Sequence, residues 1–95
     1  MPALINIPIY RKDQYNRWHD LFPDFMFDTF EIWRDHHADA IKQIEIRGDA
    51  VRAIEVDIDE YLAWISTTRK NISHDTRMEF VSRKGFILDK SAAEN

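Results

Sequence analysis

Four carboxylates lie close together in the middle of the chain, and a carboxylate pair is a common source of acid–base catalysis. Such an enzyme keeps one member protonated at neutral pH, which happens when burial raises its pKa. Asp57 and Glu60, however, form the Asp-x-x-Glu pattern of a helix N-terminus, where the helix dipole stabilises negative charge. We therefore predict no catalytic residue in this group and expect a protein that is not an enzyme. The four residues are Glu55, Asp57, Asp59 and Glu60.

The histidines are the second candidate group, because imidazole is a common metal ligand. His36 and His37 are adjacent, and neighbouring positions on a helix point about 100° apart. The i, i+4 spacing of helical two-histidine metal sites is absent. The two glycines of the chain also leave no glycine-rich loop for a nucleotide. We predict no metal and no cofactor, and whether His19 and His37 approach one another stays open.

Five basic residues gather in the C-terminal third, where they could form a nucleic-acid surface on a pair of short helices. The net charge of −4 counts against this function because it repels a polyanion. Cations in the last turn of a helix also have a structural role, since they offset the helix dipole. We therefore do not expect nucleic acid as a partner, and a nucleic-acid-associated regulator that uses the last helix pair is the alternative function. The five residues are Arg69, Lys70, Arg77, Arg83 and Lys84.

Large apolar side chains are dense around Pro23, in a segment that otherwise only connects two helices. Aromatic residues make up 13% of the chain, and a small domain needs most of them in its core. The group around Pro23 exceeds what a connection requires, so we expect part of it to form an exposed contact patch for a partner protein. The candidates are Phe22, Phe25, Met26 and Phe27.

A central unit from Phe27 to Ile65 organises the elements that position these residues. Asp28 and Glu31 form a capping box for a long amphipathic helix, with apolar residues at intervals of three and four. Gly48 supplies the left-handed residue that commonly ends a helix. We therefore predict a helix that begins after Asp28 and ends at Gly48.

The hydrophobic period changes after Gly48. Alternation over 54–58 predicts a strand with one buried face, and Asp57 then caps a third helix. That helix is expected to stop near residue 70, with Asn71 in the left-handed conformation. Ser73 is predicted to cap the last helix, and Gly85 to end it.

The N-terminal part supplies one more strand and one more helix. Isoleucines alternate over 5–9, with Pro8 between them. Proline has no N–H for a ladder, so this strand is expected at an edge, or with the side of Pro8 unpaired. Asp13 is predicted to cap the first helix, which Pro23 ends.

These elements predict an α+β fold in the order β-α-α-β-α-α, with a short two-stranded sheet packed against about four helices, which are expected on one face of the sheet. We expect one compact domain over 1–88 and a flexible C-terminal tail over 89–95. A two-stranded sheet buries little surface and leaves both edges open. It must therefore be well covered by helices or completed by a second chain.

The composition also indicates the cellular compartment of the protein. The chain has no cysteine, which excludes disulfides and thiolate chemistry and is typical of a reducing compartment. No apolar run approaches the roughly 20 residues of a membrane span, and no basic segment followed by an apolar core marks a secretory signal. We expect a cytoplasmic protein without a membrane partner.

A resemblance covers most of the chain. The pattern resembles small bacterial cytosolic proteins of unknown function that carry Val-Asp-x-Asp-Glu and an aromatic residue at a strand-to-helix junction. The resemblance implies a bacterial, cytoplasmic origin and no activity. The residues that carry it are Ile7–Ile9, Asp13, Tyr15, Thr29–Trp33, Gly48, Val51, Ile54–Asp57, Asp59–Trp64, Arg77 and Phe80.

The predicted function is protein–protein interaction without catalysis, including self-association, with a homodimer as the expected state. The two expected surfaces are the edge of the short sheet and the apolar segment around Pro23. The mechanism would be strand completion or burial of exposed aromatics.

Overall fold

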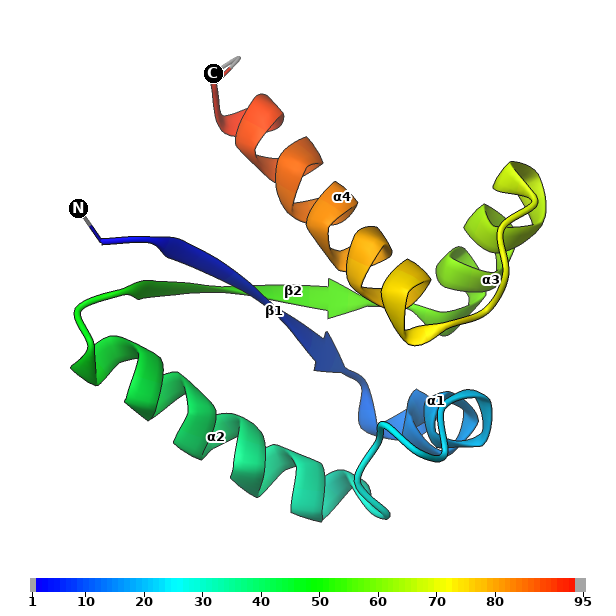
Figure 1. Ribbon diagram of the computed structural model, residues 1–95, viewed down its shortest axis with the longest axis horizontal. Coiled ribbons are helices and arrows are strands. Elements are labelled where there is room, and N and C mark those ends of the chain that lie inside the picture. Colours follow the sequence, from blue (N-terminus) through cyan, green and yellow to red (C-terminus); the bar gives the residue numbers. More distant parts are fainter. Residues whose placement is uncertain (1, 94–95) are drawn as a thin grey trace.

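The computed structural model describes the backbone of residues 2–93 and the side chains of residues 2–89. It confirms the α+β class and the order β-α-α-β-α-α (Figure 1). A short 3₁₀ turn, Lys12–Gln14, precedes the first helix. The elements are β1 Leu4–Tyr10, α1 Tyr15–Leu21, α2 Phe30–Ile46, β2 Ala50–Val56, α3 Ile58–Thr68 and α4 His74–Ala93.

The two strands pair in parallel, with Leu4 opposite Ala50 and Tyr10 opposite Val56. Parallel strands need a crossover connection of a dozen or more residues, which α1 and α2 provide here. The strands lie between α2 on one side and α4 on the other (Figure 1). The predicted two-stranded sheet is thus confirmed. The expectation that the helices pack on one face is wrong, because α2 and α4 cover opposite faces (Figure 1).

Aromatic side chains form a large part of the core, and the most deeply buried of them lie on α1 and α3. Trp18 and Tyr61 have no exposed surface, and Tyr15 is 1% exposed. Trp18 contacts the rings of Tyr10 and Tyr61, with centroid distances of 5.2 and 5.4 Å. Aromatic residues bury a large area each, which allows a small chain to form a core around so short a sheet.

Three predicted helix boundaries are confirmed. Gly48 follows α2 with a φ of +89°. The Asp57 carboxylate accepts from the N–H groups of Asp59 and Glu60 at the start of α3. Ser73 Oγ accepts from the N–H of Thr76 in the first turn of α4.

Three other boundary residues were predicted wrongly by one or two positions. Thr29, not Asp28, caps α2, because its hydroxyl accepts from the N–H of Ile32. Arg69, not Asn71, takes the left-handed position after α3, with a φ of +57°. Asp13 lies inside the 3₁₀ turn, and its carboxylate binds the Arg11 side chain instead of capping α1.

Two predicted ends also differ from the structure. The strand β2 begins at Ala50, and Ile58 belongs to α3. The prediction that Gly85 ends the last helix is wrong, because α4 continues to Ala93. Residues 89–93 of the predicted tail are therefore helical, and residues 94 and 95 lie outside the described part. None of the helices within residues 2–93 has the length and apolar character needed to cross a membrane.

Gly85 has a packing role in place of the capping role. It is buried in the middle of α4, and a Cβ atom there would lie 2.8 Å from Cγ of Asn6 on β1. That distance is far below a van der Waals contact. The absence of a side chain at Gly85 therefore allows α4 to approach the sheet closely.

Candidate functional site

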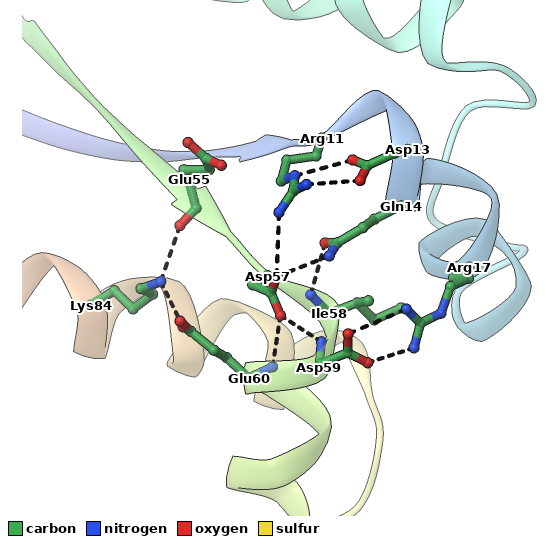
Figure 2. A network of polar contacts seen from close by, with 10 residues as sticks. All are labelled: Arg11, Asp13, Gln14, Arg17, Glu55, Asp57, Ile58, Asp59, Glu60 and Lys84. Atoms are coloured by element: carbon green, nitrogen blue, oxygen red, sulfur yellow. Dashed lines mark hydrogen bonds and ion pairs between the residues drawn. The ribbon is translucent and has the colours of Figure 1, made fainter.

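The carboxylate group at the β2–α3 junction forms a polar network with three other elements (Figure 2). One oxygen of Asp57 accepts from two N–H groups of α3. The other oxygen accepts from Gln14 Nε2 at 2.9 Å and lies 3.7 Å from Arg11 Nη1. These contacts, led by the hydrogen bond from Gln14, lower the pKa of Asp57 below its ordinary value. Asp57 is thus an ionised helix cap.

Gln14 completes this cap from a distant part of the sequence. Its side chain is nearly buried, with 7% of its surface exposed. While Nε2 donates to Asp57, Oε1 accepts from the N–H of Ile58 at 3.0 Å (Figure 2). Gln14 was not predicted from the sequence, because nothing in its neighbourhood indicates a partner 43 residues away.

Replacing Gln14 with alanine should lower the free energy of unfolding by about 1–2 kcal/mol, because it leaves the buried N–H of Ile58 without an acceptor. Urea denaturation checks this value. Asn16 to alanine, a change at an exposed position on α1, is the control and should shift stability by less than about 0.5 kcal/mol. Equal stability of the Gln14 variant and the wild type would show that water replaces the amide.

The carboxylates of Asp59 and Glu60 form ion pairs with other helices. Asp59 pairs with Arg17 at 2.7 Å, and Glu60 pairs with Lys84 at 2.9 Å (Figure 2). Lys84 also donates to the backbone C=O of Glu55 at 3.2 Å. These contacts tie α1, α3 and α4 to the end of β2.

The histidines lie on aromatic rings. His36 stacks on Phe27 with a centroid distance of 4.3 Å, and His37 lies 4.8 Å from the Trp33 ring. Partial burial lowers the pKa of His37. His19 Nε2 lies 3.7 Å from an Asp28 oxygen on another segment. Within the described residues, no group of three or more potential ligands could hold a metal ion.

The five basic residues of the alternative function do not share one free face. Lys70 pairs with Glu79 at 2.8 Å, Lys84 is held in the junction network, and Arg77 is only 4% exposed. Arg69 and Arg83 are exposed. Three of the five side chains are therefore engaged within the chain.

The apolar segment around Pro23 divides into buried and exposed residues. Phe22 and Met26 belong to the core, with 3% and 9% of their surface exposed. Phe25 and Phe27 are 60% and 41% exposed. Phe25 stacks on His74 at 4.7 Å and lines a hollow of about 440 Å³ in front of α4. Only Phe25 and Phe27 therefore belong to a surface that a partner could reach.

The two outer edges of the sheet differ in their capacity to bind another strand. Ala50 N–H donates to the C=O of Ala3, which fixes the direction of the backbone groups along both strands. N–H and C=O of one residue point to the same side, and the side alternates along a strand. In β2, the backbone groups of Val51, Ala53 and Glu55 therefore point away from β1. In β1, the backbone of Pro8 points away from β2.

The outer edge of β1 is interrupted by Pro8. The N–H that proline lacks would point outward, so the hydrogen bonds between β1 and β2 are complete. A strand added at the outer edge of β1 would find one donor missing. The prediction of an edge strand with the side of Pro8 unpaired is consistent with this geometry. A proline on an edge is one of the devices by which proteins block further strand pairing.

The outer edge of β2 is open over its middle. Within residues 2–93, no other element binds the backbone N–H or C=O of Val51 or Ala53. Beside this edge, α4 and β2 enclose a hollow of about 290 Å³ whose apolar lining is Ile54, Ile87 and Leu88. Ile87 and Leu88 are 52% and 48% exposed. An open ladder beside exposed aliphatic side chains is the chemistry that binds an extended chain.

Comparison with models of known protein families, with curated proteins and with solved structures gives no match for this chain. The resemblance to small bacterial proteins therefore stays a prediction. The contacts within this chain alone support the functional proposal.

Proposed function

We propose that this protein is a non-catalytic interaction protein that binds an extended strand at the outer edge of β2. The observation that carries the proposal is the open ladder at Val51 and Ala53, next to the exposed aliphatic side chains of Ile87 and Leu88. Added strands bind through main-chain hydrogen bonds, and side-chain pockets beside the edge supply specificity. The hollow lined by Ile54 is the pocket at this edge.

Two further features support binding over catalysis. The carboxylates at the junction are used for capping and ion pairs, as described for Asp57, Asp59 and Glu60. The sheet has two strands, so each of them is an edge strand. An edge strand carries unpaired backbone groups that can pair with another chain.

Selection from a displayed random-peptide library tests this proposal, with the chain immobilised at low density. Enriched peptides should be extended, rich in β-branched residues, and unable to bind the Ala53→Pro variant. Ala53→Pro removes one outward N–H and leaves the ladder with β1 intact. Leu4→Pro removes an outward N–H from the β1 edge and is the matched control, which should bind the same peptides. Equal binding to the Ala53→Pro variant would contradict the proposal.

A further inference from the structure

The occupant of the β2 edge is a second copy of this chain: we infer an antiparallel β2–β2 dimer whose two-fold axis passes at Ala53. This inference rests on the proposed function, because it uses the same edge. The product is a continuous four-stranded sheet in the order β1-β2-β2-β1. Four strands exceed the number that a stable sheet requires.

The asymmetry between the two edges favours a closed dimer. A two-fold axis pairs the same surface of both copies, so the open edge of β2 meets the open edge of the partner's β2. Both outer edges of the resulting sheet are then β1 edges, and each carries Pro8. Assembly therefore stops at two copies, since the remaining edges resist further pairing.

The length of β2 selects the register. Ala53 is the middle residue of Ala50–Val56, so an axis at Ala53 pairs the whole strand with its copy. The outward backbone groups of Ala53 then meet those of the partner's Ala53, and Val51 meets the partner's Glu55. A shift that centres the axis on Arg52 would place two like charges directly opposite, which is destabilising.

The helix α4 places its exposed aliphatic residues at the level of this axis. Lys84 contacts the Glu55 carbonyl, and Arg52 Nη2 donates to an Asp89 oxygen at 3.0 Å. Thus α4 runs opposite to β2, and Ile87 and Leu88 fall at the height of Ala53. The two-fold axis brings these side chains of both copies side by side. Self-association therefore buries an exposed apolar rim, which an isolated peptide would cover on one side only.

A disulfide probe tests the geometry, and the chain offers a background without cysteine. Directly opposed hydrogen-bonded residues have Cα atoms about 5.5 Å apart, inside the roughly 4.4–6.8 Å that a disulfide spans. Ala53→Cys should therefore give a cross-linked dimer under mild oxidation. Glu55→Cys is the matched control at another exposed position of the same edge. Its two thiols would be about 13 Å apart along the strand and should not cross-link.

Light scattering across a concentration series measures the dimer itself. The wild-type chain should pass from monomer to twice the monomer mass, and Ala53→Pro should weaken dimerisation at least about tenfold, because two N–H donors are lost at the axis. Circular dichroism reports whether this variant folds. If it does not, Leu88→Glu carries the test: it changes an exposed side chain and should weaken dimerisation similarly. Leu4→Pro should leave the dimer intact.

Three outcomes would overturn the inference. They are a monomer at every concentration, a dimer that cross-links through Glu55→Cys in place of Ala53→Cys, and a dimer unaffected by both Ala53→Pro and Leu88→Glu. A monomer that still selects peptides at the β2 edge would overturn only the second copy as occupant. A monomer that selects none would overturn the proposed function as well.

Discussion

Replacing Arg77 with methionine should raise the free energy of unfolding by roughly 1–4 kcal/mol, the range seen when buried ionic groups are replaced by apolar ones of similar volume. Arg77 is 4% exposed, and none of the ion pairs among the described side chains includes it. Its Nη1 is directed at the thioether of Met26, a weak acceptor. Its Nη2 contacts His74 Nδ1 at 3.0 Å, and Nε has no partner among the described residues.

The sign of the stability change depends on two free energies, the cost of desolvating the guanidinium and the gain from its cation–π contact. The guanidinium Cζ lies 4.5 Å from the Phe22 ring centroid, and a desolvated cation–π contact contributes about 2 kcal/mol. Desolvating an ion costs several kcal/mol, so the cation–π contact offsets only part of the cost. Methionine would keep the contacts of the aliphatic stem and remove the charge. The imidazole of His74, which would lose its contact with Arg77, is exposed to water.

Urea denaturation of the Arg77→Met variant measures this gain. Arg83→Met is the matched control, because it removes the same charge from an exposed position of α4 and should change stability by no more than about 0.5 kcal/mol. If Arg77→Met loses stability and Arg83→Met does not, the contacts of the Arg77 guanidinium outweigh its desolvation cost. A gain would show that this cation is retained at the expense of stability.

Replacing Gly85 with alanine should lower the free energy of unfolding by about 1–3 kcal/mol, the usual cost of overpacking. Alanine is the better helix former by about 1 kcal/mol, so a helix-propensity argument alone predicts the opposite sign. The new Cβ would lie 2.8 Å from Cγ of Asn6. Asn6 cannot easily turn away, because its Oδ1 accepts from Arg52 Nε at 2.9 Å. Either α4 or this hydrogen bond must shift.

A double-mutant cycle with Asn6→Ala separates the two effects. In the Asn6→Ala background the amide is absent, so Gly85→Ala should be neutral or stabilising through helix propensity. Thermal and urea denaturation of the four proteins give the coupling energy. Stabilisation by Gly85→Ala in the native background would show that α4 does not need the close approach to β1.

Local residues determined much of the fold. Asp57, Ser73 and Gly48 were predicted correctly because a cap or a left-handed residue depends on groups within one helical turn. The element order followed from hydrophobic periods, which report the buried face of each element. The small errors at Asp28 and Asn71 have the same origin, because Thr29 and Arg69 lie in the same turns and compete for the same positions.

Only the tertiary structure decided the residues whose partners are distant. The missing Cβ of glycine allows a left-handed helix end at Gly48 and close packing at Gly85. Which role applies depends on whether another element packs against the glycine. Gln14 became part of the Asp57 cap because the crossover brings α1 to the end of β2. In the same way, Pro8 alone indicated an edge in the sequence, whereas the parallel register decided which backbone groups point outward and left β2 with the open ladder. The physical reason is that capping acts over a few residues, while packing and strand pairing depend on where the chain returns in space.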